Sequence, residues 1–152
     1  MTGVRVQGKN EGIGGKRGKG VKGKYCREEQ SIYKEIKSYK DLIVYQKAYA
    51  LALKIYKATE SFPKSEQYGL VQQMRRASIS VPSNIAEGYR RKNRKEYIQF
   101  LNIAYASAGE LETQTSLAHD LGMLEEGDFV FLQSLCEEVS KLLFKIIKSL
   151  KQ

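Results

Sequence analysis

Asn93 to Gly122 reads NRKEYIQFLNIAYASAGELETQTSLAHDLG and carries the clearest helical pattern in the chain. Its apolar and small residues recur in alternating steps of four and three, at Tyr97, Leu101, Ala104, Ala108, Leu111, Thr115 and Ala118. This spacing places them on one face of an α-helix, as in helices that pack side by side. Asn93 with Glu96 resembles a capping box, and Gly122 suits the position after the last turn. The stretch therefore predicts one long amphipathic helix.

The segment before it predicts two more helices. The first runs from about Asp41, a plausible N-cap, to Ser61, and Pro63 ends it. Its predicted core stripe is Leu42, Tyr45, Tyr49, Ala52 and Tyr56, with Ala48, Leu51, Ile55, Ala58 and Phe62 beside it. The second runs from Ser65 or Glu66 to about Gly88, and its stripe is Leu70, Met74, Ala77 and Val81. Pro82 lies inside it, where a kink is expected rather than a stop.

A further helix is predicted from about Glu126 to Leu150. Its stripe is Phe129, Leu132, Cys136, Val139, Leu143, Ile146 and Leu150, widened by Leu135, Leu142 and Ile147. No segment has the period-two alternation of a half-buried strand, and short connections make neighbouring helices antiparallel. The fold is therefore predicted to be an all-α, up-down-up-down four-helix bundle over residues 38–152. Apolar stripes this wide present more hydrophobic surface than the core of one small bundle can bury, which favours a homo-oligomer.

The charge of the chain is unevenly placed. The 152 residues carry a formal net charge of +9. Residues 1–24 hold eight of the 13 glycines, with seven basic residues and one acidic residue. The same segment has few large apolar residues, and burying them cannot offset the entropy lost in ordering so many glycines. Residues 1–37 are therefore predicted to form a disordered basic tail.

The tail matches two nucleotide-binding patterns by composition alone. Gly18 to Lys24 fits both GxGxxG and GxxxxGK. A phosphate-binding loop needs a preceding strand, which is missing, and Tyr25 stands where the second pattern requires Ser or Thr. We therefore expect no cofactor. The chain also has no apolar run of the ~18–20 residues that span a membrane, and its N-terminus offers no signal peptide, so a cytoplasmic protein without a membrane role is expected.

The sequence offers no catalytic or metal-ligating set. His119 is the only histidine, no acidic residue stands three positions before it, and Cys26 and Cys136 form no CxxC. Asp120 follows His119 directly, and neighbours on a helix point in different directions, so no His–Asp dyad is expected. Cys136 is predicted to be a buried thiol on the apolar stripe. The protein is predicted not to be an enzyme and to hold no metal.

Short motifs follow one another along the predicted helices and their connections. They are Tyr39 to Ala48 (YKDLIVYQKA), Phe62 to Glu66 (FPKSE), Gln73 to Ala77 (QMRRA), Ser80 to Gly88 (SVPSNIAEG), Phe100 to Ala104 (FLNIA), Ser107 to Thr113 (SAGELET) and Asp120 to Gly122 (DLG). In this order they resemble the 23S rRNA intervening-sequence protein family of four-helix bundles. The resemblance covers residues 38 to 150 without a break and excludes residues 1–37.

This resemblance implies a bacterial bundle without established catalytic activity. Members are encoded within insertions in large-subunit ribosomal RNA genes or elsewhere in bacterial genomes, and known members assemble as homopentamers. In fold and charge the chain is also similar to accessory bundle proteins of diversity-generating retroelements, which pair with a reverse transcriptase and bind nucleic acid. Fold-level likeness of this second kind is the weaker guide to function.

Basic side chains are the strongest candidates for a function, because Lys and Arg neutralise phosphates without reading sequence. The predicted nucleic-acid contacts are Arg90, Arg91, Lys92, Arg94, Lys95 and Arg75, with Lys16, Arg17, Lys19, Lys22 and Lys24 of the tail. The alternative is that Arg75 and Arg76 pair with Glu87, Glu110 or Glu112 within or between subunits. A structural ion pair between Arg76 and Glu87 is favoured, since the resembling motifs include both.

Aromatic and amide side chains are predicted to be structural. Tyr45, Tyr49, Tyr56, Tyr89, Tyr97 and Tyr105 could stack on unpaired bases, but their spacing favours bundle core or subunit interface. Asn84 lies on the apolar stripe, where an amide would set helix register. Two functions stay open: an oligomeric bundle that binds RNA or DNA, and an adaptor that binds a protein partner such as a reverse transcriptase.

Overall fold

A computed structural model describes residues 35–152, and Ile36–Gln152 form one compact unit. Residues 1–34, with the predicted tail contacts Lys16, Arg17, Lys19, Lys22 and Lys24, lie outside the described residues. The unit contains α2 (Ile43–Ala58), α3 (Leu70–Tyr89), α4 (Arg94–Asp120) and α5 (Glu126–Lys151), and no strand occurs within residues 35–152.

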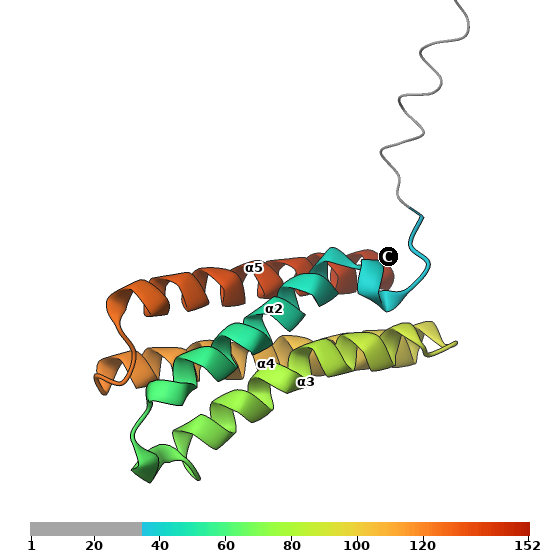
Figure 1. The fold of residues 1–152 in the computed structure, drawn as a ribbon. Helices are drawn as coiled ribbons and strands as arrows, with labels where there is room; N and C mark the ends of the chain where they lie inside the picture. Colours follow the sequence, from blue (N-terminus) through green and yellow to red (C-terminus); the bar gives the residue numbers. More distant parts are fainter. Residues whose placement is uncertain (1–34) are drawn as a thin grey trace, which may run out of the picture. The chain divides into compact units, whose positions relative to one another are not determined.

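The four helices form an antiparallel bundle. Each packs on two neighbours: α2 lies against α3 and α5, and α4 lies against the same two helices. The α2–α3 and α4–α5 connections share one end of the bundle, and the α3–α4 turn lies at the other (Figure 1). The predicted up-down-up-down fold is confirmed. The α2/α3 side and the α4/α5 side are therefore opposite faces of the bundle.

The predicted core faces of α4 and α5 are largely confirmed. Every predicted α4 position from Leu101 to Ala118 is buried, while Tyr97 is only half-buried. On α5, the buried positions are Leu132, Cys136, Val139, Leu143 and Ile147. Ile147 thus replaces the predicted Ile146 at the last turn. Small residues on α4, such as Ala104 and Ala108, let the neighbouring helices approach closely.

The predicted centre of the α2 core stripe is wrong, although Ala48, Leu51 and Ile55, which were predicted beside it, are buried. The buried residues are Val44, Ala48, Leu51 and Ile55. The tyrosines lie one position further around the helix, where Tyr49 is 52% and Tyr56 is 38% exposed. Aliphatic side chains fill the space between the helices, whereas a phenol at the edge keeps its hydroxyl in reach of water. Tyr105 on α4 is also exposed, so it is not a core residue either.

The ends of the helices are set by local polar contacts. Asp41 does not cap α2: its carboxylate accepts hydrogen bonds from the backbone N–H of Ser38 (2.9 Å) and Lys37 (3.0 Å), closing a 3₁₀ turn at Tyr39–Asp41. Two further 3₁₀ turns, Thr59–Ser61 and Lys64–Glu66, connect α2 to α3. Helix α3 then continues through Pro82, as expected, and the kink expected there stays a prediction.

The predicted Asn93 cap and the predicted glycine after α4 are confirmed, but the Glu96 half of the predicted capping box is not formed. The Asn93 side chain accepts a hydrogen bond from the Lys95 N–H (2.8 Å), which satisfies a donor of the first turn. At the other end Gly122 has φ +74°, a conformation that favours glycine. The N–H groups of Gly122 and Met123 donate to the carbonyls of His119 and Ala118, both at 2.9 Å. This pair of bonds is a Schellman motif and directs the chain into α5.

Candidate functional site

The α3–α4 turn gathers five cations, Arg90, Arg91, Lys92, Arg94 and Lys95, which we call the basic turn. Arg90 follows the last residue of α3, and α4 begins at Arg94 directly after its Asn93 cap. All five side chains are exposed. The short turn between two antiparallel helices therefore concentrates positive charge at one end of the bundle.

Few of these charges are neutralised. Arg91 pairs with Glu87 and lies over the Phe100 ring, 4.8 Å from its centroid. The Arg90 guanidinium lies 5.2 Å from the centroid of Tyr39, a cation–π contact that leaves its charge in place. Within residues 35–152, the basic turn forms no other ion pair. The turn can therefore attract and neutralise phosphate groups.

Arg75 lies away from the basic turn. It is fifteen residues before Arg90 along α3, about 22 Å at ~1.5 Å per residue. Its Nε donates to Thr59 Oγ1 (2.9 Å) and its Nη2 to the carbonyl of Tyr56 (3.4 Å). The structure therefore does not bring Arg75 together with the other predicted contacts. Arg75 instead ties the start of α3 to the end of α2.

The predicted Arg76–Glu87 ion pair does not form within one chain. Both residues lie on α3 eleven positions apart, about 16 Å at ~1.5 Å per residue. Glu87 pairs with Arg91 one turn further on instead. Because one helix carries both residues, their separation along its axis is fixed. A pair between subunits stays a prediction.

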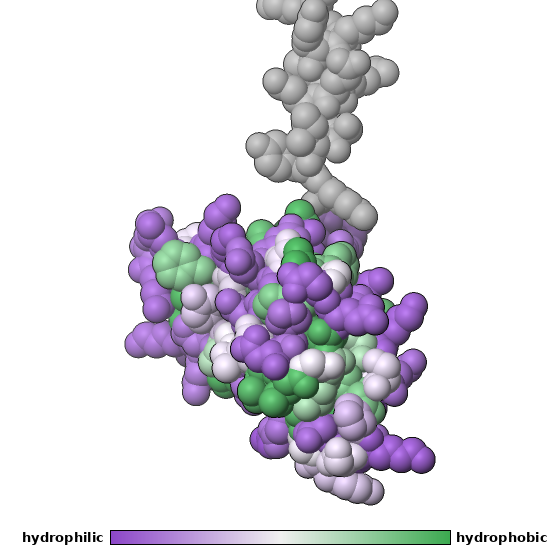
Figure 2. Space-filling view, turned by 90° about the vertical axis from the view of Figure 1, so that its left-hand side faces the viewer, coloured by the Kyte–Doolittle hydropathy of each residue, from purple (hydrophilic) through white to green (hydrophobic). Residues whose placement is uncertain are grey.

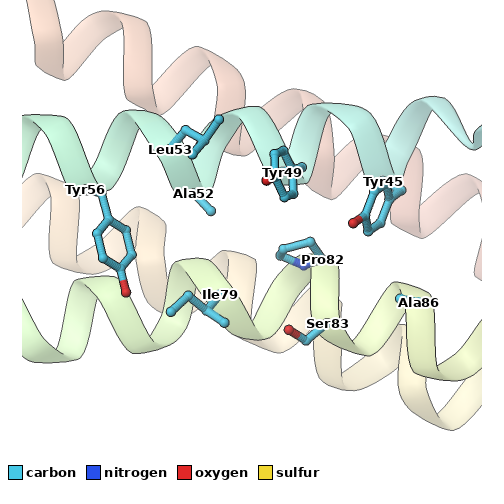
Figure 3. A pocket seen from close by; sticks show the side chains of 9 residues that line it. All are labelled: Tyr45, Tyr49, Ala52, Leu53, Tyr56, Ile79, Pro82, Ser83 and Ala86. Carbon is cyan, nitrogen blue, oxygen red and sulfur yellow. The ribbon is translucent and has the colours of Figure 1, made fainter. Parts of the chain in front are cut away.

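An apolar groove runs between α2 and α3. Figure 3 shows the side chains that line it, which are Tyr45, Tyr49, Ala52, Leu53 and Tyr56 from α2 and Ile79, Pro82, Ser83 and Ala86 from α3. Its volume is about 390 Å³. Leu53 is 59% exposed and Ile79 46%, so large apolar side chains face solvent here. The groove has the composition of a surface that another protein covers.

Tyrosine rings line one end of this groove. The ring centroids of Tyr39 and Tyr45 lie 4.9 Å apart, and those of Tyr45 and Tyr49 lie 6.0 Å apart. Burial raises the pKa of Tyr45, and the neighbouring Tyr39 and Tyr49 raise it further. Tyr45 therefore remains a neutral phenol at physiological pH. The sequence analysis assigned Tyr45 and Tyr49 to the core and did not identify Leu53 as a residue of the groove. The spacing of four positions between residues 45, 49 and 53 could have shown that they share one helix face.

A second exposed aromatic pair lies on the opposite face of the bundle. Tyr105 of α4 and Phe144 of α5 have ring centroids 6.5 Å apart, and both side chains are exposed. They line a hollow of about 360 Å³ together with Glu112, Glu137 and Lys141. The α2/α3 groove and this surface are different patches, one on each side of the bundle.

The amide of Asn84 has a structural role, although it is half-buried rather than buried. Its Nδ2 donates to the carbonyl of Ser80 (2.8 Å) and to Ser80 Oγ (3.0 Å). Ser80 Oγ in turn bonds with Ser107 Oγ of α4 (2.8 Å). This chain of hydrogen bonds joins α3 to α4 at one register, which is the role that the sequence predicted for the amide.

The carboxylate that His119 contacts at hydrogen-bond distance is that of Glu126, not that of its neighbour Asp120. Its Nε2 lies 2.7 Å from Glu126 Oε2, whereas its Nδ1 lies 3.6 Å from the nearer carboxylate oxygen of Asp120. The ring stacks on Phe129 at 4.1 Å between centroids. The Phe129 ring of α5 holds the imidazole at the end of α4, where both carboxylates reach it. Within residues 35–152, no group of three or more His, Cys, Asp and Glu side chains could hold a metal ion.

Cys136 is fully buried on α5, as predicted. Burial raises the pKa of its thiol to about 12, the negative charge of Glu112 adds to this, and a hydrogen bond with Thr115 opposes it. The thiolate is the reactive form, and at pH 8 it would be about one part in 10⁴ of the folded protein.

We therefore expect the thiol of Cys136 in a Cys26→Ser variant to react with a disulfide reagent only when the chain unfolds. The measurement is labelling at pH 8 with and without urea. Rapid labelling of the folded protein would contradict the buried position of Cys136.

The chain is similar to known proteins in sequence and in fold. The sequence model of the 23S rRNA-intervening sequence protein family matches residues 40–145. A crystal structure described as a protein of unknown function from the S23 ribosomal protein family of Bacteroides thetaiotaomicron VPI-5482 is similar, with a TM-score of 0.66 and 26% identity. The similarity covers 72% of this chain and 98% of that one. No curated protein matches.

The comparisons agree with the architecture of residues 35–152. Among the helices of this part of the chain, none is both long enough and apolar enough to cross a lipid bilayer. The matched residues begin at Lys40 in the first 3₁₀ turn and end at Lys145 in α5, so they include all or part of each of the four helices. The chain belongs to the 23S rRNA-intervening sequence protein family.

Proposed function

We propose that this protein is a non-enzymatic, cytoplasmic homo-oligomer, specifically a homopentamer, that binds the backbone of RNA or DNA through the basic turn. The observation that carries the proposal is the exposed cluster of five cations, of which only Arg91 is ion-paired within residues 35–152. Such a cluster binds phosphates without reading bases and releases condensed counterions. In an oligomer the basic turns repeat, and several copies can contact one strand.

The two apolar surfaces support self-association. Tyr49, Leu53 and Ile79 are exposed on the α2/α3 side, and Tyr105 and Phe144 on the α4/α5 side. Because the two patches differ and lie on opposite faces, contact between them is head-to-tail. Head-to-tail contacts close into rings when the rotation between copies is suitable. A ring built this way would cover both patches.

A salt series tests the nucleic-acid proposal. Binding of the protein to a short RNA duplex of generic sequence is expected to weaken steeply between about 50 and 200 mM salt. Replacing Arg90, Lys92, Arg94 and Lys95 together by Gln should lower affinity at least about tenfold. It should also reduce the log–log slope by about one for each lost phosphate contact. Fluorescence anisotropy with a labelled duplex measures both quantities.

The matched control removes the same charge elsewhere. Lys54, Lys57, Lys64 and Lys148 are exposed and lie outside the basic turn, so their replacement by Gln changes net charge equally. This control should retain most of the affinity. Equal losses in both variants would mean that net charge alone drives binding, and a wild-type affinity independent of salt would contradict the proposal.

The second candidate function is an adaptor for another protein, such as a reverse transcriptase, without a direct nucleic-acid role. The apolar α2/α3 groove favours it, because a partner helix could lie there with its apolar face inward. The same salt series separates the two functions. An adaptor would show no duplex binding at low salt, and its basic turn would serve solubility only.

A further inference from the structure

A hollow between the end of α2 and the start of α3 differs in chemistry from the apolar groove. It has a volume of about 580 Å³, within the ~300–1,000 Å³ range of small-molecule sites. Its polar and aromatic lining consists of Tyr56, Gln67, Tyr68, Gln72, Arg75 and Arg76. We call it the Tyr68 pocket. It continues the α2/α3 groove, with which it shares Tyr56 and Ile79, but its lining is cationic and includes no acidic residue.

One guanidinium of this pocket is held in place. Arg75 donates to Thr59 Oγ1 and to the Tyr56 carbonyl, and its guanidinium carbon lies 4.7 Å from the centroid of the Tyr56 ring. None of these partners is negatively charged. The Arg75 charge therefore stays uncompensated while its position is fixed, which suits it to receive an anion.

A second guanidinium, that of Arg76, lies next to it along α3 and is exposed. Within the part of the chain that the structure describes, neither arginine lies within 4.0 Å of a carboxylate oxygen. Both arginines line this hollow, and two guanidinium groups without a counter-ion favour a phosphate, which can accept hydrogen bonds from both.

Tyr68 supplies an aromatic face beside these charges. Its side chain is 89% exposed, and it stacks on no other ring among residues 35–152. The amides of Gln67 and Gln72 line the same pocket and can both donate and accept hydrogen bonds. An exposed ring between amides and cations has the composition of a site that stacks a base and holds its phosphate. Figure 2 views the bundle end that carries the α2–α3 connection, where hydrophilic residues surround smaller hydrophobic areas.

From this geometry we propose that the Tyr68 pocket binds one unpaired nucleotide of a single strand. The base stacks on Tyr68, Arg76 and Arg75 hold the phosphate, and the glutamine amides contact the base edge. The inference rests on the proposed nucleic-acid function and adds a preference for unpaired bases, because bases inside a duplex expose no free face. The pocket lies about 22 Å from the basic turn along α3, at ~1.5 Å per residue, so the two sites are separate.

The test compares a single-stranded oligouridine with the RNA duplex used for the basic turn. Tyr68→Ala is expected to weaken oligouridine binding about 5- to 100-fold, the usual loss for one stacked base, and to leave duplex binding unchanged. Arg76→Gln should reduce the salt slope for oligouridine by about one. Oligothymidine should behave like oligouridine, since stacking tolerates any base.

Phe131→Ala is the matched control, because Phe131 is another exposed aromatic residue and lies outside the pocket and outside both apolar patches. It should leave oligouridine binding unchanged, and thermal melting should show that both aromatic variants remain folded. Unchanged or equally weakened binding of both probes by Tyr68→Ala would overturn the pocket and leave the basic turn standing. Equal competition by an oligoglutamate peptide would show recognition of charge alone and would also overturn it. Failure of the wild-type protein to bind either probe would overturn both proposals.

Discussion

Replacing Gly88 by alanine is expected to destabilise the bundle by about 2 kcal/mol, even though alanine is the better helix former. Gly88 is buried where α3 meets α4, and a Cβ there would lie 2.9 Å from Phe100 Cβ and 2.9 Å from Tyr97 Cδ2. The backbone fixes the Phe100 Cβ, so the two helices must separate. Overpacking of this kind costs about 1–3 kcal/mol or more, and it outweighs the ~1 kcal/mol that alanine gains over glycine in a helix.

Gly109→Ala is the matched control for this prediction. Gly109 lies in the middle of α4 and is exposed, and a Cβ added there would meet no atom within 4 Å. The same substitution should therefore stabilise the protein by up to about 1 kcal/mol. Urea unfolding followed by circular dichroism measures both variants. A stability change of the same sign in the two would contradict the close α3–α4 approach at Gly88.

Replacing Leu53 by glutamate is expected to convert the proposed oligomer into a monomer of 17.3 kDa. Leu53 is 59% exposed in the single chain, so the change should cost the fold little. In the oligomer the same position would be covered by the next copy, and an unpaired carboxylate buried there is strongly unfavourable. Analytical ultracentrifugation at micromolar concentration gives the mass of the assembly.

Gln99→Glu controls for the added charge, since Gln99 is exposed on α4 and lies outside the groove. It should leave the assembly intact. Phe144→Glu should also break the assembly, because Phe144 belongs to the opposing patch on α5. A wild-type protein that sediments as a monomer would refute self-association. An intact Leu53→Glu oligomer would show that the α2/α3 groove is not the interface.

The helices that the sequence predicted best are those whose pattern is simple. On α4 the buried side is lined by Leu101, Ala104, Ala108 and Leu111, and the regular spacing identifies that side without ambiguity. On α2, apolar residues cover more than half of the helix circumference. Periodicity alone then leaves two adjacent stripes as candidates for the core, and the stripe with the tyrosines is not the buried one. The size of the space between four helices selects Ala48 and Leu51 over Tyr49, and no spacing rule contains that information.

Part of the candidate site can be predicted from the sequence, and part of it requires the tertiary structure. Sequence alone locates the basic turn, because Arg90 to Lys95 are contiguous and antiparallel helices require a turn there. Only the tertiary structure places Arg75 against Thr59 and gathers Tyr68 and Arg76 around one hollow. Contacts along one helix follow from its period, and a cluster of consecutive residues needs no fold to be recognised. Contacts between helices depend on axial register and rotation, which the packing of all four helices together determines.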